Sequence, residues 1–221
     1  MVCYYACFLE KNKQIYIITS NYNKNGNSEY IKVFDLGGDK IKEINDSNED
    51  TYCINNYYDK KLSKNYIISG NYGYIKSFDY NNNKLYHKYN DKGRGSVHSI
   101  IIRNMKDILK IIESCYDGFI RIWNFHSGLL LTKIKCFIPL FGITLWNDNY
   151  LFAGCSDNSI KLIDLEKKLI IKSLKSHSNK VLTVKKIIHP KYGECIISQN
   201  WEYSSILIHL NKSIYTKNKF I

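Results

Sequence analysis

The sequence predicts an all-β protein built from a repeated unit of about four antiparallel strands. Five short segments recur along the chain, and most read apolar, basic, apolar, bulky. Counted from the isoleucine of each copy, the intervals are 44, 45, 40 and 46 residues, which is the spacing of a repeat architecture. No segment shows a sustained helical period. The copies are residues 30–35, 74–79, 119–124, 159–164 and 205–209, and their isoleucines are Ile31, Ile75, Ile120, Ile160 and Ile206.

The strands can be placed in chain order from runs of Ile, Tyr, Val and Phe broken by Asn, Gly, Asp and Lys. Residues 1–9 are apolar, lack a basic lead and meet Glu10 and Lys11 at once, so we expect a strand and no signal peptide. The first two copies of the recurring segment, at 30–35 and 74–79, follow turns at residues 25–28 and 71–73.

The third and fourth units give the clearest strands. In the third, an Asp-Gly pair at 117–118 supplies a tight hairpin turn, since both residues tolerate positive φ. In the fourth, residues 157–158 and 166–168 form the turns. We expect strands at 96–103, 108–114, 119–125 and 129–136, then at 139–146, 150–154, 159–165 and 169–174.

Two features of these units resemble the WD40-repeat family. The strand, the Asp-Gly turn and the sequence Ile-Arg-Ile-Trp-Asn at 120–124 are similar to the third strand of a WD40 repeat. His177, followed by Val181 and Val184, is similar to the family's Gly-His position. The resemblance covers residues 2–209 and implies a β-propeller of four-stranded antiparallel blades, with the first strand of each blade innermost. It assigns structural positions of the repeat to Asp117, Trp123, Asp157, His177 and Ser198.

The match to the family pattern is uneven. Glu202 replaces the turn aspartate in the fifth unit, and the first two units lack this aspartate. Trp123 is the single tryptophan at its position, which Phe34, Phe78 and Ile163 hold in other units. In the fifth unit, which has one extra residue, we expect His209 at that position.

The chain is predicted to be a single domain, residues 1–221, with about five blades. The expected blades are 1–46, 47–91, 92–136, 137–175 and 176–221, with residues 212–221 as the outer strand of the last. Because WD40 propellers usually have seven blades, our preferred interpretation is a stretch of an incomplete, larger propeller. A closed five-bladed propeller is the alternative.

The chain has a formal net charge of +12, which invites a nucleic-acid or acidic-membrane hypothesis. Only three of the 32 basic residues are arginine, the side chain best suited to phosphate, and the lysines are scattered among asparagines. The charge therefore favours a lysine-covered surface over a dedicated polyanion site.

The seven cysteines form no metal-binding motif and are expected to be free thiols in a reducing compartment. The longest apolar stretch, residues 136–146, is too short for a membrane-spanning helix. We therefore expect an intracellular protein, cytoplasmic or nuclear, without a transmembrane segment.

Catalytic, cofactor and metal sites are not predicted. The six histidines have no metal-ligand spacing, and the recurring turn aspartates are not placed to face one another across a site. The glycines at 37–38 and 93–95 lack the sequence of a phosphate-binding loop. We accordingly expect no enzymatic activity and no cofactor.

With catalytic, cofactor and metal sites not predicted, we expect the functional site to be a binding surface. The resemblance implies that the protein is a scaffold or adaptor that docks proteins through the loops before the first strand and between the second and third. On this chain, the candidates for partner binding are Tyr72, Tyr116, Ser156 and Trp201, since aromatic side chains favour strong contacts. Two alternatives are a propeller that binds RNA or acidic lipid through its lysines, and the regulatory or sensor propeller of a larger multidomain protein.

Overall fold

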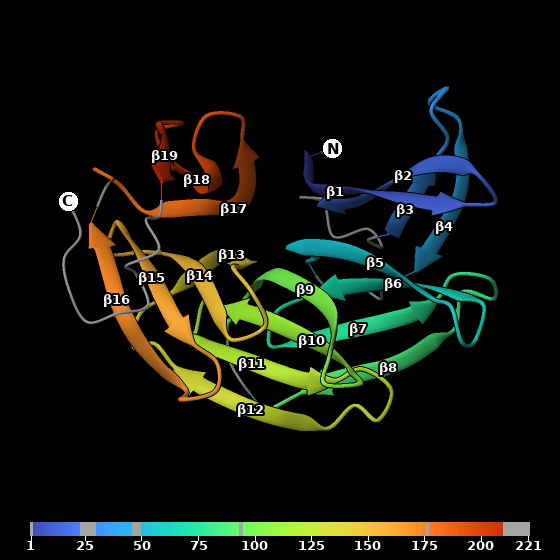
Figure 1. Cartoon of the computed structure of the whole chain (residues 1–221). Helices are drawn as coiled ribbons and strands as arrows, with labels where there is room; N and C mark the ends of the chain where they lie inside the picture. Colours follow the sequence, from blue (N-terminus) through green and yellow to red (C-terminus); the bar gives the residue numbers. More distant parts are fainter. Residues whose placement is uncertain (1, 23–29, 46–49, 93–94, 176, 210–221) are drawn as a thin grey trace. The chain divides into compact units, whose positions relative to one another are not determined.

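The protein folds into antiparallel sheets that follow one another along the chain (Figure 1). The computed structural model describes residues 2–22, 30–45, 50–92, 95–175 and 177–209, which form nineteen strands. No helix in these residues is both long and apolar enough to cross a lipid bilayer. The chain divides into two compact units, residues 1–133 and 134–221, with the boundary inside the twelfth strand.

The first unit contains three four-stranded sheets, each with its strands in chain order. In Figure 1 they are coloured from blue through teal to green. The first sheet comprises β1 (Val2–Lys11), β2 (Gln14–Tyr22), β3 (Tyr30–Phe34) and β4 (Lys40–Asn45). The second comprises β5 (Cys53–Asp59), β6 (Lys64–Gly70), β7 (Tyr74–Asp79) and β8 (Leu85–Asn90). The third comprises β9 (Val97–Met105), β10 (Ile108–Cys115), β11 (Phe119–Asn124) and β12 (Leu130–Lys135).

The second unit contains two sheets of the same topology. The fourth sheet comprises β13 (Leu140–Leu145), β14 (Tyr150–Cys155), β15 (Ser159–Asp164) and β16 (Leu169–Lys175). The fifth comprises β17 (Val181–His189), β18 (Gly193–Asn200) and β19 (Ser205–His209), which makes three strands within the described residues. The outer strand expected at 212–221 lies outside those residues.

This all-β architecture of consecutive antiparallel blades confirms the predicted propeller fold class, with five sheets present. The predicted turns of the third and fourth sheets have the expected backbone, since Gly118 has φ 82° and Asn158 has φ 66°. The strands follow the predicted segments closely because the apolar alternation and these turn residues are local signals.

The sheets of the first unit pack face against face. Where two consecutive sheets of one unit pack, the face that the earlier sheet contributes is called its trailing face here, and the face that the later sheet contributes is called its leading face. The remaining faces take the same names from the equivalent cross-strand positions. Between the first and second sheets, a core forms from the trailing face of one and the leading face of the other. It contains Leu9, Ile18, Ile31, Val33 and Ile44 of the first sheet and Ile54, Ile67, Phe78 and Tyr80 of the second.

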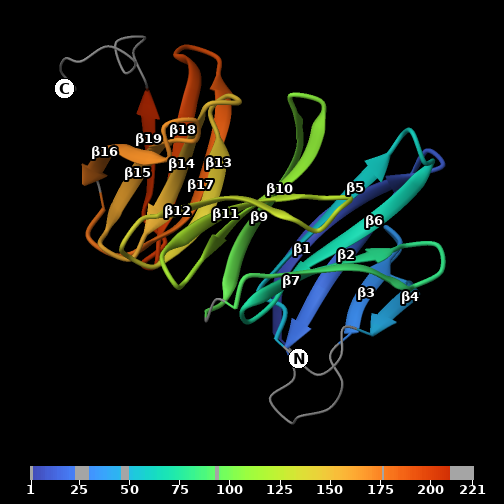
Figure 2. The ribbon, with the colours of Figure 1, turned by 90° about the horizontal axis from the view of Figure 1, so that it is seen from below.

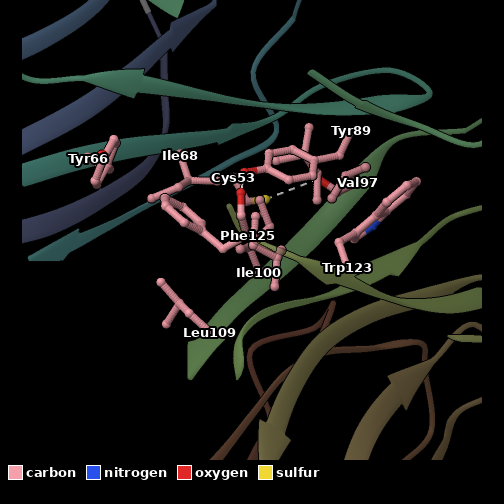
Figure 3. Packing of buried hydrophobic residues seen from close by; sticks show 11 residues of the cluster. Cys53, Tyr66, Ile68, Tyr89, Val97, Ile100, Leu109, Trp123 and Phe125 are labelled. Atoms are coloured by element: carbon pink, nitrogen blue, oxygen red, sulfur yellow. Dashed lines mark hydrogen bonds between the residues drawn. The ribbon is translucent and has the colours of Figure 1, made fainter. Parts of the chain in front are cut away.

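A second core joins the second and third sheets and is rich in aromatic rings (Figure 3). Phe125 lies against Tyr66 with ring centroids 5.1 Å apart, and the hydroxyl of Tyr89 donates to the Phe125 carbonyl at 2.7 Å. The thiol of Cys53 donates to the Val97 carbonyl at 3.3 Å, as the dashed line shows. The first strands of neighbouring sheets therefore lie side by side at the inner edge of the stack.

These first strands run in the same direction. Cys53 contacts Val97, and two residues further along β5 the Asn55 amide donates to the Ile100 carbonyl at 3.0 Å. Equivalent turns of different sheets therefore lie at the same end of the first unit. The turns that join second and third strands form one end, and those that join first and second strands form the other.

In the second unit, the first strands β13 and β17 also lie side by side (Figure 2). A core of Phe152, Ile160 and Leu162 on the fourth sheet packs against Val181, Val184 and Ile196 on the fifth. Gly154 allows this approach, because a Cβ there would lie 2.5 Å from the Val181 carbonyl oxygen.

The register of the fifth sheet corrects one prediction. Ser198 pairs with Ile206, in the position where Glu113 pairs with Arg121 in the third sheet. Two residues on, Ile208 occupies the position of Trp123, so the prediction of His209 at that position was wrong. Both pairs are eight residues apart along the chain, so the turn between β18 and β19 contains no extra residue, and the expected alignment of the last copy was one residue out.

Candidate interaction surface

The turns between second and third strands are tied to the start of the first strand of their own sheet. The Tyr116 amide donates to the Ser96 carbonyl at 2.9 Å, that of Ser156 to Pro139 at 3.1 Å, and that of Trp201 to Lys180 at 3.0 Å. The same bond thus recurs in the third, fourth and fifth sheets and fixes the backbone from which each candidate side chain projects.

Tyr72 and Tyr116 come from different sheets but meet at one residue. Tyr72 forms an antiparallel bridge with Ser96, whose carbonyl accepts from Tyr116. The adjacent Gly73 amide donates to the Gly95 carbonyl at 2.8 Å. The structure therefore places both predicted tyrosines on the same end of the first unit.

About half of each of these aromatic side chains is open to solvent. Tyr72 is 56% exposed and Tyr116 is 52% exposed. Two aromatic residues that the sequence did not single out extend this surface, since the His98 ring lies 5.9 Å from Tyr116 and 5.8 Å from Tyr52, centroid to centroid. These four residues, Tyr52, Tyr72, His98 and Tyr116, are called the tyrosine surface below.

In the second unit, Trp201 is 56% exposed and Ser156 is partly buried. The Lys180 ammonium lies 3.9 Å from the centroid of the Trp201 ring, within the range of a cation–π contact. Beside it, the Glu202 carboxylate accepts from the Ser178 hydroxyl at 3.1 Å and the Asn179 amide at 3.0 Å. The fifth-sheet turn thus presents an aromatic ring held by polar neighbours.

A buried charge network lies beneath the tyrosine surface. Arg121 is 2% exposed and donates to Asp91 at 2.9 Å, to Glu113 at 3.1 Å and to both carboxylate oxygens of Asp117. Lys133 also pairs with Asp91. Asp91 lies between the second and third sheets, so one guanidinium joins the intersheet loop, the sheet interior and the turn that carries Tyr116.

Burial and pairing shift the acidities of this network in opposite directions. Burial raises the pKa of Glu113 to about 7, against the charge and hydrogen bond of Arg121 and the Trp123 indole that donates to it at 3.3 Å. At Asp91, partial burial raises the pKa, but the hydrogen bonds from Lys133 and Arg121 outweigh it and hold the pKa below the usual value.

Comparison with known proteins adds to this geometry. No family model matches the chain. The chain is 34% identical over 76 residues to the WD repeat domain-containing protein 83 homolog of Dictyostelium discoideum. This match covers 34% of the chain and 23% of that protein. With the repeat and the sheet topology, this match fits the WD40 propeller family. WD40 propellers are generally non-enzymatic and typically bind proteins.

The predicted WD40 positions fall into three local arrangements. Asp117 pairs with Arg121, and the Asp157 carboxylate accepts from the Ser159 amide at 3.2 Å and the Lys161 ammonium at 3.3 Å. Both aspartates thus pair with a basic residue four positions further along the chain. The recurring basic residue was visible in the sequence, but its pairing with the turn aspartate was not.

In the fifth sheet, the WD40 histidine and serine contact each other. The Nε2 atom of His177 lies 2.8 Å from the Ser198 hydroxyl, and burial lowers the pKa of His177. Its Nδ1 atom is buried without a hydrogen-bond partner among the described residues. Glu202, at the WD40 aspartate position, bonds Ser178 and Asn179.

Proposed function

We propose that this protein is a WD40-repeat scaffold or adaptor, non-enzymatic, that binds protein partners through the tyrosine surface and Trp201. The observation that carries the proposal is the recurrence of a half-exposed aromatic residue at the same turn in the second, third and fifth sheets. Large aromatic side chains on a rigid backbone bind with little loss of conformational entropy and dominate many protein interfaces.

The rigidity of the support favours this surface. Tyr116 is anchored through its own amide to Ser96, and the following Asp117 is held by the buried Arg121. A partner that docks there meets a preformed surface, which lowers the entropic cost of binding.

The compartment remains a prediction. Six cysteines in the described residues are free thiols. Unpaired thiols are typical of reducing compartments, and this supports the proposal that the protein acts in the cytoplasm or nucleus.

Affinity purification with quantitative mass spectrometry tests the scaffold proposal. Tyr72→Ala and Tyr116→Ala should each reduce recovery of the same partners, with a loss in affinity on the order of tenfold or more for each. Leu129→Ala is the matched control, because Leu129 is also exposed but lies in a different turn of the third sheet. Partners recovered equally with all three variants would contradict the use of this surface.

A second candidate, binding of a polyanion such as RNA, is favoured by lysines at the opposite end of the first unit. The turn between β5 and β6 carries Lys60 and Lys61, Lys64 begins β6, and the turn between β9 and β10 carries Lys106. Affinity for a single-stranded RNA should then fall steeply with added salt, and Lys60→Ala with Lys61→Ala should flatten that dependence. Binding that does not change with salt would exclude this function.

A further inference from the structure

The leading face of the first sheet carries the same cross-strand row that other sheets bury. In every sheet, one row joins the first three strands, and its second and third members are large and apolar. The second-strand members are Ile17, Ile67, Ile111, Leu151 and Ile196, and the third-strand members are Phe34, Phe78, Trp123, Ile163 and Ile208.

The first sheet differs from the others in exposure. Ile67, Ile111, Leu151 and Ile196 are all buried, whereas Ile17 and Phe34 are only partly buried. Phe8, which pairs with Ile17 in this row, is 70% exposed. Further along the same sheet, Ile15, Leu36 and Ile41 line an open hollow of about 480 Å³.

The trailing face of the fifth sheet is likewise more exposed than the equivalent face of other sheets. The central pair of this face is Ile18 with Val33 in the first sheet, Ile112 with Ile122 in the third and Phe152 with Leu162 in the fourth, and all six residues are buried. In the fifth sheet the pair is Ile197 with Leu207, which are 37% and 39% exposed.

The chain itself shows what such faces are built to contact. In both intersheet cores of the first unit and in the core of the second, a trailing face packs against a leading face. The exposed leading face of the first sheet and the exposed trailing face of the fifth keep the apolar residues of that contact. An apolar face of this kind marks an interaction site.

We propose that the leading face of the first sheet, centred on Phe8, binds the trailing face of the fifth sheet, centred on Leu207, of a second copy of this chain. The contact is heterologous, because different faces meet, so it produces head-to-tail assemblies. It uses surfaces other than the tyrosine surface, and its failure leaves the scaffold proposal untouched.

Sedimentation velocity on the purified 221-residue chain tests this assembly. The wild-type chain should show concentration-dependent species of two or more chain masses. Phe8→Glu and Leu207→Glu should each be monomeric, since each blocks one of the two faces. Leu129→Glu, at an exposed leucine on neither face, should assemble like the wild type.

Mixing the two monomeric variants gives the decisive result. Phe8→Glu retains an intact trailing face and Leu207→Glu an intact leading face, so an equimolar mixture should form a dimer that grows no further. Circular dichroism of each variant checks that it is folded. A wild-type chain that is monomeric at all concentrations, or folded variants that do not combine when mixed, would overturn the proposal.

Discussion

In the third sheet a buried guanidinium fixes the turn to the sheet, whereas in the fifth sheet a histidine and a serine meet at the corresponding level through a neutral hydrogen bond. Arg121 pairs across the strands with Glu113, and Ser198 stands at the Glu113 position in the fifth sheet. The serine instead contacts His177, which precedes the sheet. The same blade is thus stabilised either by charges or by small polar groups, provided that each buried polar group finds a partner.

The fourth sheet lies between these two cases. Lys161 takes the position of Arg121 and pairs with Asp157, but Ala153 faces it where the third sheet has Glu113. The basic residue is retained although its buried acidic partner is absent, which indicates that the pairing with the turn aspartate is the shared feature. The three sheets therefore differ in how much stability depends on one side chain.

The largest difference should appear when the basic residue is removed from the third sheet. Arg121→Ala should lower the free energy of unfolding by about 3–5 kcal/mol, because it leaves the buried Glu113 and its neighbours without a counter-charge. Urea denaturation monitored by circular dichroism measures this loss.

The matched change in the fourth sheet is Lys161→Ala. The Asp157 carboxylate there is partly exposed, and such an ion pair contributes only about 0–1 kcal/mol. Equal losses for the two variants would show that the buried network does not distinguish the sheets.

The next largest effect should be a dependence of the free energy of unfolding on pH. Glu113 binds its proton with a pKa of about 7 in the folded protein and 4.5 in the unfolded chain. This group therefore contributes most stability below pH 4.5, and the contribution is lost as the pH rises toward 7. Denaturation of the wild type and of Glu113→Gln at a series of pH values between 4.5 and 8 measures the difference.

Glu113→Gln should be less stable than the wild type at the low end of this range, because an amide cannot accept from both Arg121 and Trp123, and its side chain at this position does not titrate. Relative to this variant, the wild type should lose stability as the pH rises. The lowered pKa of His177 acts in the other direction below pH 6.5 and is present in both proteins, so the comparison removes it. A difference that stays constant with pH would mean that Glu113 is already ionised at the low end of the range.

The smallest effect should come from the fifth sheet. Ser198→Ala removes the hydrogen bond with His177 and a longer one to the Ile206 carbonyl, and should cost about 1 kcal/mol. Ser173→Ala, at an exposed serine on β16, is the control and should change stability by less than about 0.5 kcal/mol. A loss for Ser198→Ala as large as that for Arg121→Ala would remove the contrast between the two sheets.

The strands were predictable from sequence where the signals are local. Asp117 with Gly118 and Asp157 with Asn158 mark turns within a few residues, and the alternation of apolar side chains gives the strand on either side. The fifth sheet was predicted out of register at Ile208 because cross-strand pairing, which no local pattern records, decides which residue faces the core.

The candidate surface was predictable only in part. Tyr72, Tyr116 and Trp201 stand beside recognisable turns, so their position could be read from the repeat. Tyr52 and His98 join them through the packing of one sheet on the next, and Arg121 gathers carboxylates from a turn, a strand and an intersheet loop. Such long-range convergence has no signature in a single sequence.

The connections between second and third strands differ in length from sheet to sheet. Ile17 and Phe34, which pair across these strands in the first sheet, are 17 residues apart in the sequence, whereas Ile196 and Ile208 in the fifth are 12 apart, yet both pairs keep the same place in their sheets. Changes in the length of this connection thus leave the positions of the core residues unchanged. Descendants of such a repeat can acquire new recognition loops by insertion while the buried residues stay under their old constraints, so that binding specificity and folding can evolve separately.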